Sequence, residues 1–222
     1  MADYNEKQLE ARIRDIFTIA RKNREKKASN FLDPGQQQIA LDVARSFPGM
    51  DFYFDGGHEE AERKILVAYP EDLRDEPFML PLGALRVTPR DPDEYPGHRD
   101  YLGAILGLGI NREKIGDILV GKRNADVIVK QEIMEYIGLN LIKVGNVPVD
   151  VDEISLKELL QPERPYKELK GTVASLRLDA VAGIAFGISR TKMAPFIKGE
   201  NLRLNFRVVK DPATPVKEGD VI

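Results

Sequence analysis

The chain has 222 residues, of which 42% are apolar and 31% charged, and its formal net charge at pH 7 is −3. It contains no cysteine, which excludes disulfides and cysteine-bound zinc, and no apolar run approaches the roughly 20 residues that a membrane-spanning helix needs. The N-terminal stretch MADYNEKQLEARIRDIF is charged throughout and lacks the apolar core of a signal peptide. We therefore expect a soluble, cytoplasmic protein without membrane insertion, made of one large domain or of two to three small ones.

Residues 1–76 are predicted to form a small α+β domain. A helix is expected over residues 4–27, because five apolar side chains form one stripe at helical spacing: Leu9, Ile13, Ile16, Phe17 and Ala20. A break at Asp33-Pro34-Gly35 precedes a second helix, which ends before Pro48. The segments MDFYFDGG and KILVAYP then predict two strands of a hairpin.

Acidic side chains gather around the loop of that hairpin: Asp51, Asp55, Glu59, Glu60 and Glu62. Their spacing matches no calcium-binding loop, so we interpret them as solvated and expect no metal site. His58, in the same loop, is interpreted as facing water, with a contact to a partner as the alternative.

Residues 77–160 are predicted to form a ferredoxin-like, RRM-like domain. Strand and helix signals follow one another as β-α-β-β-α-β over residues 84–154, which is the split βαβ pattern. This order predicts a four-stranded antiparallel sheet with two helices on one face. The same architecture serves RNA-recognition modules, enzymes and oligomerisation domains, so it names no function.

Two features of this middle domain leave alternatives open. The turn GKRNAD places Lys122 and Arg123 at a hairpin tip, either as an RNA contact or as an ordinary polar turn. In GAILGLG, Gly103 and Gly107 lie inside a predicted helix, whereas a dinucleotide-binding loop would open a helix after a strand. We interpret the glycines as close packing against the sheet, and His98 as part of the helix start instead of a catalytic group. No cofactor and no catalytic residue are expected.

Residues 161–222 are predicted to be a connector followed by a basic domain. Residues 164–210 carry ten Lys/Arg against three Asp/Glu, which indicates an anionic partner, with an ordinary solvated face as the alternative. A helix in SLRLDAVAGIAFGISR should bury four apolar side chains on one face: Leu178, Val181, Ile184 and Ala185. Gly187 suits a left-handed helix end, and Ser189 suits the N-cap of a second helix, with Ile188 and Met193 as its hydrophobic staple.

The second helix of the tail is expected to bury Met193, Phe196 and Ile197 and to present Arg190 beside free amides that suit phosphate. We find no functional explanation for Pro195 inside this helix. Beyond it, apolar residues alternate with Arg203, Asn205 and Arg207 over residues 202–208, which predicts a strand whose outer face shows two arginines. Such a surface is typical of nucleic-acid binding through the phosphate backbone.

The tail resembles the alpha-L RNA-binding domain of the ribosomal protein S-four type over residues 175–222. The matching motif comprises Arg177-Leu178-Asp179, Ser189-Arg190, Ile197-Lys198-Gly199, Leu202-Arg203-Leu204-Asn205 and Gly219-Asp220-Val221-Ile222. The resemblance implies that structured RNA is contacted by Arg177, Ser189, Arg190, Lys192 and Lys198; the charge pattern adds Arg203, Arg207, Lys122 and Arg123. The sequence departs from this family at two points. Phe206 stands where many members have glycine. Many members also continue into a final strand, which would lie beyond Ile222, so an incomplete domain stays an alternative.

The segments HRDYLGAILGLGINREKIGDILV and GGHEEAERK resemble sequences of the YlmH family. The resemblance extends over essentially the full length of the chain. This resemblance implies a three-part RNA-binding protein without known catalysis. The family is linked to the large ribosomal subunit, to ribosome-associated quality control with stalled peptidyl-tRNA, and to cell-division gene neighbourhoods. We therefore expect a non-enzymatic binder of structured rRNA or tRNA. The alternatives are an RNA-modifying enzyme of the pseudouridine synthase type and a protein-interaction module for division proteins, with the acidic middle as its surface.

Overall fold

A computed structural model of the chain describes residues 2–161 and 168–222. The chain divides into two compact units, residues 1–163 and residues 164–222, which we name unit 1 and unit 2. Within the described residues, no helix combines the length and the hydropathy that a membrane span requires.

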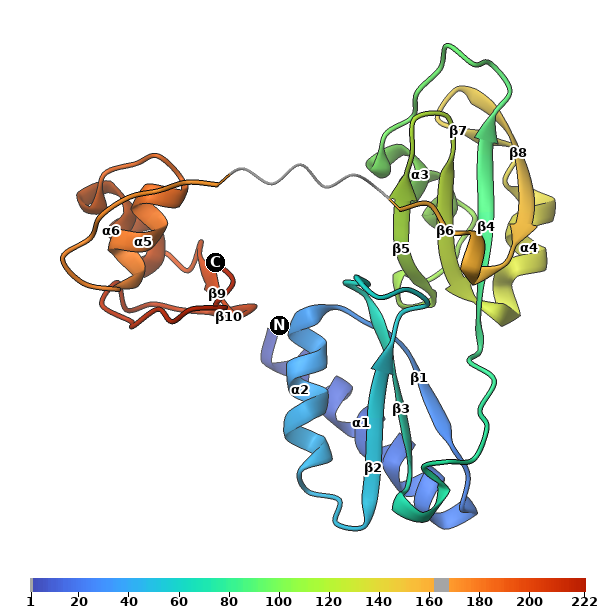
Figure 1. The fold of residues 1–222 in the computed structure, drawn as a ribbon, viewed down its shortest axis with the longest axis horizontal. Coiled ribbons are helices and arrows are strands. Elements are labelled where there is room, and N and C mark those ends of the chain that lie inside the picture. Colours follow the sequence, from blue (N-terminus) through green and yellow to red (C-terminus); the bar gives the residue numbers. More distant parts are fainter. Residues whose placement is uncertain (1, 162–167) are drawn as a thin grey trace. The chain divides into compact units, whose positions relative to one another are not determined.

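Unit 1 begins with two helices packed on a three-stranded antiparallel sheet (Figure 1). Its elements are α1 (Ala2–Asn23), β1 (Lys27–Leu32), α2 (Pro34–Ala44), β2 (Met50–Asp55), β3 (Lys64–Pro70) and the short 3-10 helix η1 (Glu71–Leu73). The strand order is β1-β3-β2. The predicted stripe of α1 is confirmed, because its five side chains lie in or against one core with Val43 and Leu66.

The first helix is shorter than the predicted range of residues 4–27. Arg24 adopts a left-handed φ of 52°, and the amide of Glu25 donates to the carbonyl of Ala20 at 3.1 Å. This hydrogen bond is typical of a helix end, and α1 accordingly stops at Asn23.

Strand β1 was not predicted. It pairs with β3 with a change of register between Ala28 and Phe31. At this irregularity the hydroxyl of the buried Ser29 accepts a hydrogen bond from the amide of Leu66 at 2.8 Å. A bulge interrupts the apolar–polar alternation by which a strand is recognised, so the sequence pattern missed it.

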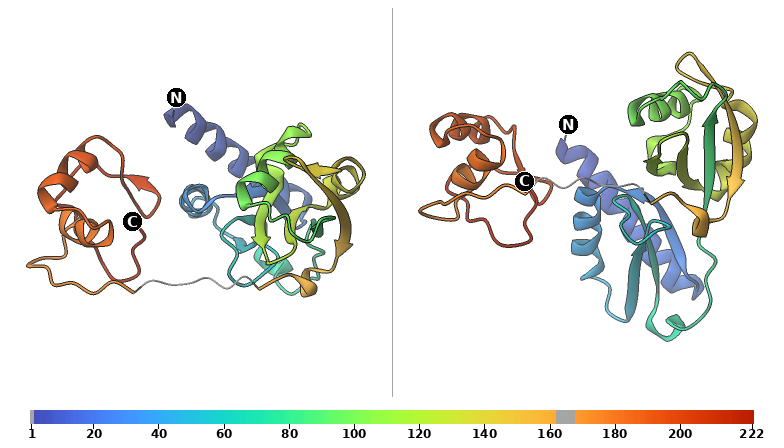
Figure 2. Two further views of the ribbon diagram at one scale, coloured as in Figure 1. Left: turned by 90° about the horizontal axis from the view of Figure 1, so that it is seen from above. Right: turned by 45° about the horizontal axis from the view of Figure 1, so that its top comes forward.

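The second part of unit 1 confirms the predicted β-α-β-β-α-β order. Its elements are β4 (Leu82–Pro89), α3 (His98–Gly107), η2 (Arg112–Lys114), β5 (Ile115–Val120), β6 (Ala125–Lys130), η3 (Gln131–Ile133), α4 (Met134–Asn140), β7 (Lys143–Val144), β8 (Val147–Ile154) and η4 (Leu156–Glu158). The antiparallel strand order is β5-β6-β4-β8-β7, so a two-residue strand is added to the four predicted ones. Helices α3 and α4 lie on the same side of this sheet (Figure 2) and share its core.

The opposite face of the middle sheet is covered in part by the N-terminal part of unit 1. Leu119 and Ile128 of this sheet belong to one buried cluster with Phe31 and Val67 of the first sheet. Lys130, two residues from Ile128 and on the same face, is only 7% exposed and donates to the carbonyl of residue 29 at 3.0 Å. The uncovered part of this face, along β8, carries the exposed Asp150 and Asp152. The face is therefore partly covered and partly acidic, unlike the open face on which an RNA-recognition module stacks bases.

The interpretation of the α3 glycines as close packing is wrong. Gly103 and Gly107 are exposed, and a side-chain carbon built on either would meet no atom within 4 Å. Gly109 is equally open, but its φ of 82° explains the choice of glycine there. Gly103 and Gly107 have no such local reason.

Unit 2 consists of two helices and a small hairpin: α5 (Leu178–Ala185), α6 (Arg190–Lys198), β9 (Arg203–Leu204) and β10 (Arg207–Val208). Its core contains Leu178, Ala182, Met193, Ile197 and Leu202.

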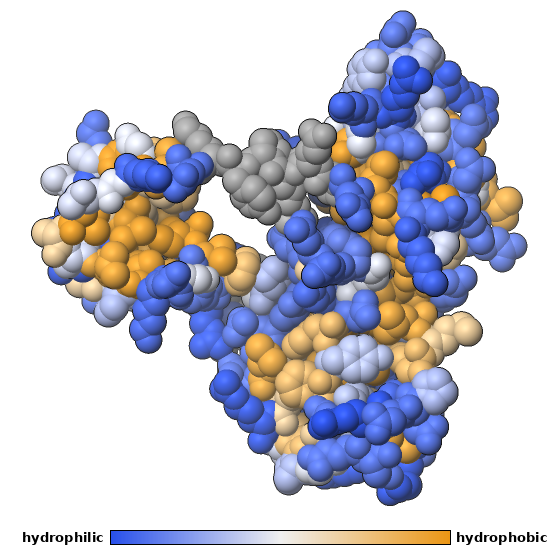
Figure 3. All heavy atoms as spheres, in the orientation of Figure 1, coloured by the Kyte–Doolittle hydropathy of each residue, from blue (hydrophilic) through white to orange (hydrophobic). Residues whose placement is uncertain are grey.

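The buried faces of both helices differ in part from the prediction. Ala182 and Gly183 are buried in α5, while Ile184 is 36% exposed and Ala185 is exposed. In α6, Phe196 is 53% exposed. Because α5 is apolar nearly all round, its sequence pattern could not identify the inward face. Figure 3 shows apolar surface gathered on one side of unit 2.

The single strand predicted over residues 202–208 is instead a tight hairpin. Arg207 pairs with Leu204, and the two residues between them, Asn205 and Phe206, have φ of 51° and 66°. Paired residues share one face of a hairpin, so Leu204 and Arg207 lie on one face and Arg203 on the other. The predicted face with two arginines is therefore wrong, because the turn falls between them.

Candidate nucleic-acid interface

The start of α6 follows the predicted capping chemistry. Ser189 has extended φ and ψ of −64° and 148°, and its hydroxyl accepts from the amide of Lys192 at 3.4 Å. Gly187 has the left-handed φ of 66° expected of a helix end. Ile188 and Met193 both contribute to the core of unit 2. These residues fix where α6 begins, and therefore where Arg190 lies.

A buried carboxylate joins the two arginines at the centre of the predicted site. Arg177 donates from Nε and Nη2 to the carboxylate of Asp179 at 3.3 and 2.9 Å. Arg190 Nε lies 3.0 Å from Oδ2 of the same carboxylate. The Asp179 side chain is 5% exposed, against 36% for Arg177 and 53% for Arg190. We name these three residues the Arg–Asp–Arg cluster; its two guanidinium groups meet at one point of the surface.

The ionisation of the cluster follows from this geometry. The hydrogen bond from Arg177 lowers the pKa of Asp179, and the bond from Arg190 lowers it further, against the opposing effect of burial. The same bond with Asp179 raises the pKa of Arg177. With two guanidinium groups and one carboxylate, the cluster carries one net positive charge on fixed donors.

Backbone contacts hold Asp179 in place. Its amide donates to the carbonyl of Pro212 at 3.0 Å, and the amide of Leu178 donates to Thr214 at 2.9 Å. The first turn of α5 is thus tied to the segment after the hairpin. These amides are occupied, which leaves the side chains, not the end of α5, to contact a ligand.

Gly183 allows α6 to approach α5 closely. A side-chain carbon at this position would lie 2.9 Å from the carbonyl oxygen of Ile188 and 3.6 Å from the amide nitrogen of Arg190. The first distance is shorter than normal packing permits, so only glycine fits without a backbone shift. This close approach brings the start of α6 within reach of Asp179.

The other cations predicted for the tail are exposed but do not share one face. Lys192 and Lys198 are six residues apart in α6, which separates their directions by about 120°. Arg203 and Arg207 lie on opposite faces of the hairpin. The structure therefore gathers Arg177, Ser189 and Arg190, and distributes the remaining tail residues around unit 2.

Lys122 and Arg123 lie where the sequence placed them, at the tip of the β5–β6 hairpin in unit 1. Both are exposed, and the turn is closed by a hydrogen bond from the amide of Gly121 to the carbonyl of Asn124 at 2.8 Å.

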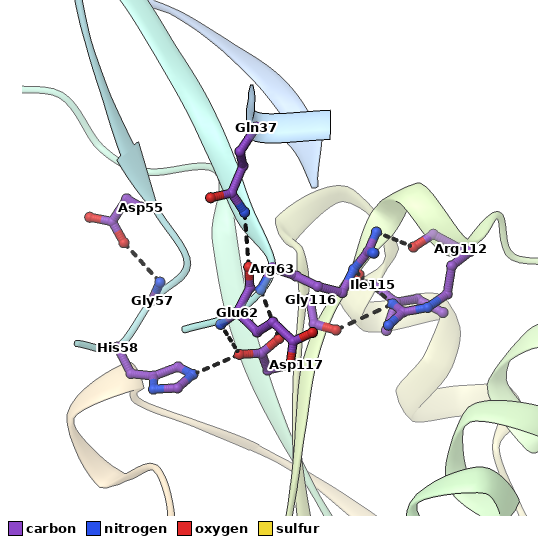
Figure 4. Close-up of polar contacts among 10 residues, drawn as sticks. All are labelled: Gln37, Asp55, Gly57, His58, Glu62, Arg63, Arg112, Ile115, Gly116 and Asp117. Carbon is purple, nitrogen blue, oxygen red and sulfur yellow. Dashed lines mark hydrogen bonds and ion pairs between the residues drawn. The ribbon is translucent and has the colours of Figure 1, made fainter. Parts of the chain in front are cut away.

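The structure also reveals a polar junction inside unit 1 that sequence reasoning missed (Figure 4). Asp117 of β5 accepts hydrogen bonds from the amides of Glu62 and Arg63 at 2.7 and 3.0 Å, and His58 Nε2 lies 3.2 Å from its carboxylate. His58 is only 17% exposed, so its interpretation as a water-facing side chain is wrong. Nothing in one sequence pairs residues 59 positions apart, because no local pattern connects them.

Two arginines complete this junction. Arg63 Nε donates to the carbonyl of Ile115 at 2.9 Å, and Arg112 donates to the same oxygen from Nη1 at 2.7 Å. Burial lowers the pKa of both, and the charge of Arg63 contributes to bringing that of Arg112 to about 10. These side chains serve to join the two sheets of unit 1.

The acidic residues around the β2–β3 loop have separate surroundings. Asp51 lies 2.6 Å from Arg74, and Asp55 accepts the amide of Gly57 at 2.8 Å, while Glu59 and Glu60 are exposed. In residues 2–161 and 168–222, no three His, Asp or Glu side chains converge as metal ligands would.

Comparisons with known proteins agree with this arrangement. A family described as "Putative RNA-binding domain in YlmH" matches residues 95–158, and one described as "S4 domain" matches residues 176–222. A Bacillus subtilis (strain 168) protein, "Ribosome-associated protein quality control protein P2", is 33% identical over 196 residues, which are 88% of this chain and 76% of that protein. The solved structure "Cell division protein ylmH from Streptococcus pneumoniae" has a TM-score of 0.59 at 21% identity, covering 71% of this chain and 95% of that one. At that identity the likeness concerns the fold alone.

Proposed function

This chain belongs to the YlmH family, and from that premise we propose that it is a non-catalytic protein that binds structured rRNA or tRNA on ribosomes. Neither matched family is described by a reaction. The name of the Bacillus relative points to ribosome-associated quality control. We extend the proposal to the large ribosomal subunit and to that process, which would take place in the cytoplasm.

The Arg–Asp–Arg cluster is the observation that carries the proposal. Two half-exposed guanidinium groups converge on one buried carboxylate, which leaves donors of both directed at the same patch of solvent. Planar guanidinium groups recognise phosphate through paired hydrogen bonds. Folded RNA presents ridges of phosphate and ribose more readily than base edges, so a fixed pair of arginines suits its shape.

Fixing the arginines in advance lowers the entropy that binding would otherwise lose. A free arginine side chain has many rotamers. Each such side chain that is immobilised on binding costs roughly 0.5–1.5 kcal/mol. Asp179 has already ordered Arg177 and Arg190 in the free protein. The carboxylate therefore positions the two donors while subtracting one charge from the site.

The burial of Asp179 determines which variant can test this proposal. Removing both arginines alone would leave Asp179 buried without a partner, which destabilises a protein. We therefore use the triple variant Arg177→Gln, Asp179→Asn and Arg190→Gln. The matched control is Glu168→Gln, Lys170→Gln and Lys210→Gln, which removes the same charges from exposed groups of the same unit.

Co-sedimentation with separated ribosomal subunits is the measurement. We expect wild type and the control variant to sediment with the large subunit, and the cluster variant to remain in the supernatant. Equal sedimentation of both variants would reject the cluster as the contact. Sedimentation with the small subunit alone would reject the large-subunit assignment.

A further inference from the structure

A groove of unit 1 lies on the helical side of the middle domain. It has a volume of about 530 Å³ and runs between α3 and the segment that joins α4 to β7. Arg99 and Gly103 line it from α3, and Ile142 and Lys143 line it from the other side. The groove is open and has room for one nucleotide.

The sheet of the middle domain is a poor surface for RNA, which makes this groove a candidate. Residues 95–158 match a family described as a putative RNA-binding domain, yet the sheet face that would stack bases is covered over β5 and β6 and carries the exposed Asp150 and Asp152 along β8. Several cations of this region are also occupied: Arg112 binds backbone carbonyls, Lys114 lies 3.1 Å from Glu132, and Lys130 is buried. These features favour another surface of the domain for RNA.

The groove carries two cations that are free to bind an anion. The side chains of Arg99 and Lys143 are exposed and form no hydrogen bond or ion pair with any residue in the described ranges. The acidic residue of the lining, Asp100, already accepts the amide of Gly97 at 2.8 Å at the start of α3. The positive charge of the groove thus complements a phosphate backbone.

The floor of the groove suits a base or a ribose. Ile142 is 70% exposed, and Leu108 and Leu141 also line the groove. The exposed Ile142 lies in the same groove as the cations Arg99 and Lys143. Such a surface suits a ligand with one flat apolar part and one anionic part. An unpaired nucleotide has both parts.

We propose that the groove between α3 and β7 binds an unpaired nucleotide of RNA, with Arg99 and Lys143 on its flanking phosphates and Ile142 against its base. This inference rests on the proposed RNA-binding function and adds a second contact in unit 1. The domain then uses its helical side for RNA, while part of its sheet packs against the N-terminal part of unit 1.

The exposed glycines of α3 agree with this assignment. Glycine is a poor helix former, and neither backbone conformation nor neighbouring atoms require it at positions 103 and 107. Because these two glycines have no side chain, a ligand in the groove can approach the backbone of α3.

Cross-linking tests the proposal on the full chain. The probe is a single-stranded eight-nucleotide oligouridylate that contains 4-thiouridine, with a duplex of the same length for comparison. We expect cross-linked peptides to include residues 103–108 or 141–143, and the yield to fall about tenfold in Arg99→Gln with Lys143→Gln. The control, Arg45→Gln with Arg90→Gln, removes two cations held by Asp42 and Asp150 and should cross-link like wild type.

The outcomes separate this inference from the proposed function. Cross-links confined to residues 168–222 would overturn the groove as a nucleotide site while leaving RNA binding by unit 2 intact. No cross-link and no binding to rRNA anywhere in the chain would overturn both. Loss of a protein partner, instead of the oligonucleotide, in the groove variant would also reject RNA as the occupant.

A substitution that keeps the charge gives an independent test. Gly103→Leu adds a side chain into open space in the groove, and Gly138→Leu adds one at an exposed position of α4 that does not line it. Both variants should melt no lower than wild type, because leucine favours helix. We expect only Gly103→Leu to weaken oligouridylate binding; equal affinity of the two would contradict the proposal.

Discussion

Asp179 determines how the charge of unit 2 is presented. A carboxylate in a basic segment reduces its net charge, yet this one holds Arg177 and Arg190 at 2.9 and 3.0 Å and is itself buried. The cluster therefore fixes the position of its two arginines at the expense of one positive charge. Ser189 and Gly183 serve the same end, because they fix the start of α6 and its distance from α5.

Asp179→Asn distinguishes position from charge. The substitution adds one net positive charge but weakens the bonds that orient both arginines, so we expect weaker rRNA binding in a filter or fluorescence assay. Tighter binding would show that charge alone governs the site.

The same variant has a pH signature. The pKa of Asp179 in the folded chain is lowered from 3.8, so its stabilising effect is fully present above about pH 4 and is lost as pH falls through the lowered pKa. The melting temperature of wild-type unit 2 should decline in that acidic range, and the decline should be smaller in Asp179→Asn. Parallel melting curves of the two proteins against pH would contradict the ion-pair geometry.

Gly183→Ala tests the close approach of the helices. The added carbon would lie 2.9 Å from a backbone oxygen, which we expect to destabilise unit 2 by about 1–3 kcal/mol and to displace Arg190, with weaker RNA binding. Gly103→Ala is the matched control, because its added carbon meets nothing; it should stabilise α3 by about 1 kcal/mol. Thermal denaturation of the two variants should give shifts of opposite sign.

Local chemistry made part of the site predictable. The N-cap Ser189 and the left-handed Gly187 depend on neighbouring residues and were placed from the sequence. The bridge of Asp179 to Arg190 was not, because it arises only when α6 packs on α5.

At the scale of elements, the hairpin of unit 2 shows why alternation can mislead. Residues 202–208 alternate like one strand, but a two-residue turn lies in their middle. Asn205 holds this turn: its side chain donates to Asp220 at 2.7 Å and accepts the amide of Val221 at 3.0 Å. The hydrogen bond from Asn205 is the first cause of the lowered pKa of Asp220.

Asn205→Ala should destabilise the hairpin. Alanine at a φ of 51° costs roughly 1–2 kcal/mol in backbone strain, and the two side-chain hydrogen bonds are lost as well. Asn205→Gly loses the same bonds but adopts this positive φ without strain, so it should melt between the alanine variant and wild type. If both variants melted like wild type, this side chain would not stabilise the turn.

The other elements also divide into those that the sequence pattern predicted and those that it missed. Long periodic segments such as α1 and the β-α-β-β-α-β order were predictable, because their buried stripes repeat over many residues. Strand β1 was missed, since its bulge breaks the alternation. The inward face of α5 was misjudged because nearly every side of that helix is apolar.

At the scale of the whole molecule, unit 1 joins two sheets through one buried cluster and one polar junction. Two segments carry the resemblance to the YlmH family, GGHEEAERK and HRDYLGAILGLGINREKIGDILV. The first and the end of the second meet there through Arg63, Arg112 and Asp117. A single sequence places each segment but not their contact, because they lie about 50 residues apart.

Asp117→Ala tests whether this junction unites unit 1. The variant leaves the amides of Glu62 and Arg63 without their acceptor, which we expect to destabilise unit 1 by about 1–3 kcal/mol. In hydrogen exchange followed by mass spectrometry, protection should fall together in β3 and in β5, and stay unchanged over residues 176–199. Loss of protection in β3 alone would show that the two sheets unfold independently.

The most direct test of the Arg–Asp–Arg cluster is the salt dependence of rRNA binding. Each phosphate contact contributes roughly 0.7–0.9 to the slope of log affinity against log salt concentration. The triple variant Arg177→Gln, Asp179→Asn and Arg190→Gln should therefore lower this slope by about 1.5 relative to wild type. The control Glu168→Gln, Lys170→Gln and Lys210→Gln should keep the wild-type slope. Equal slopes for the triple variant and wild type would contradict the account.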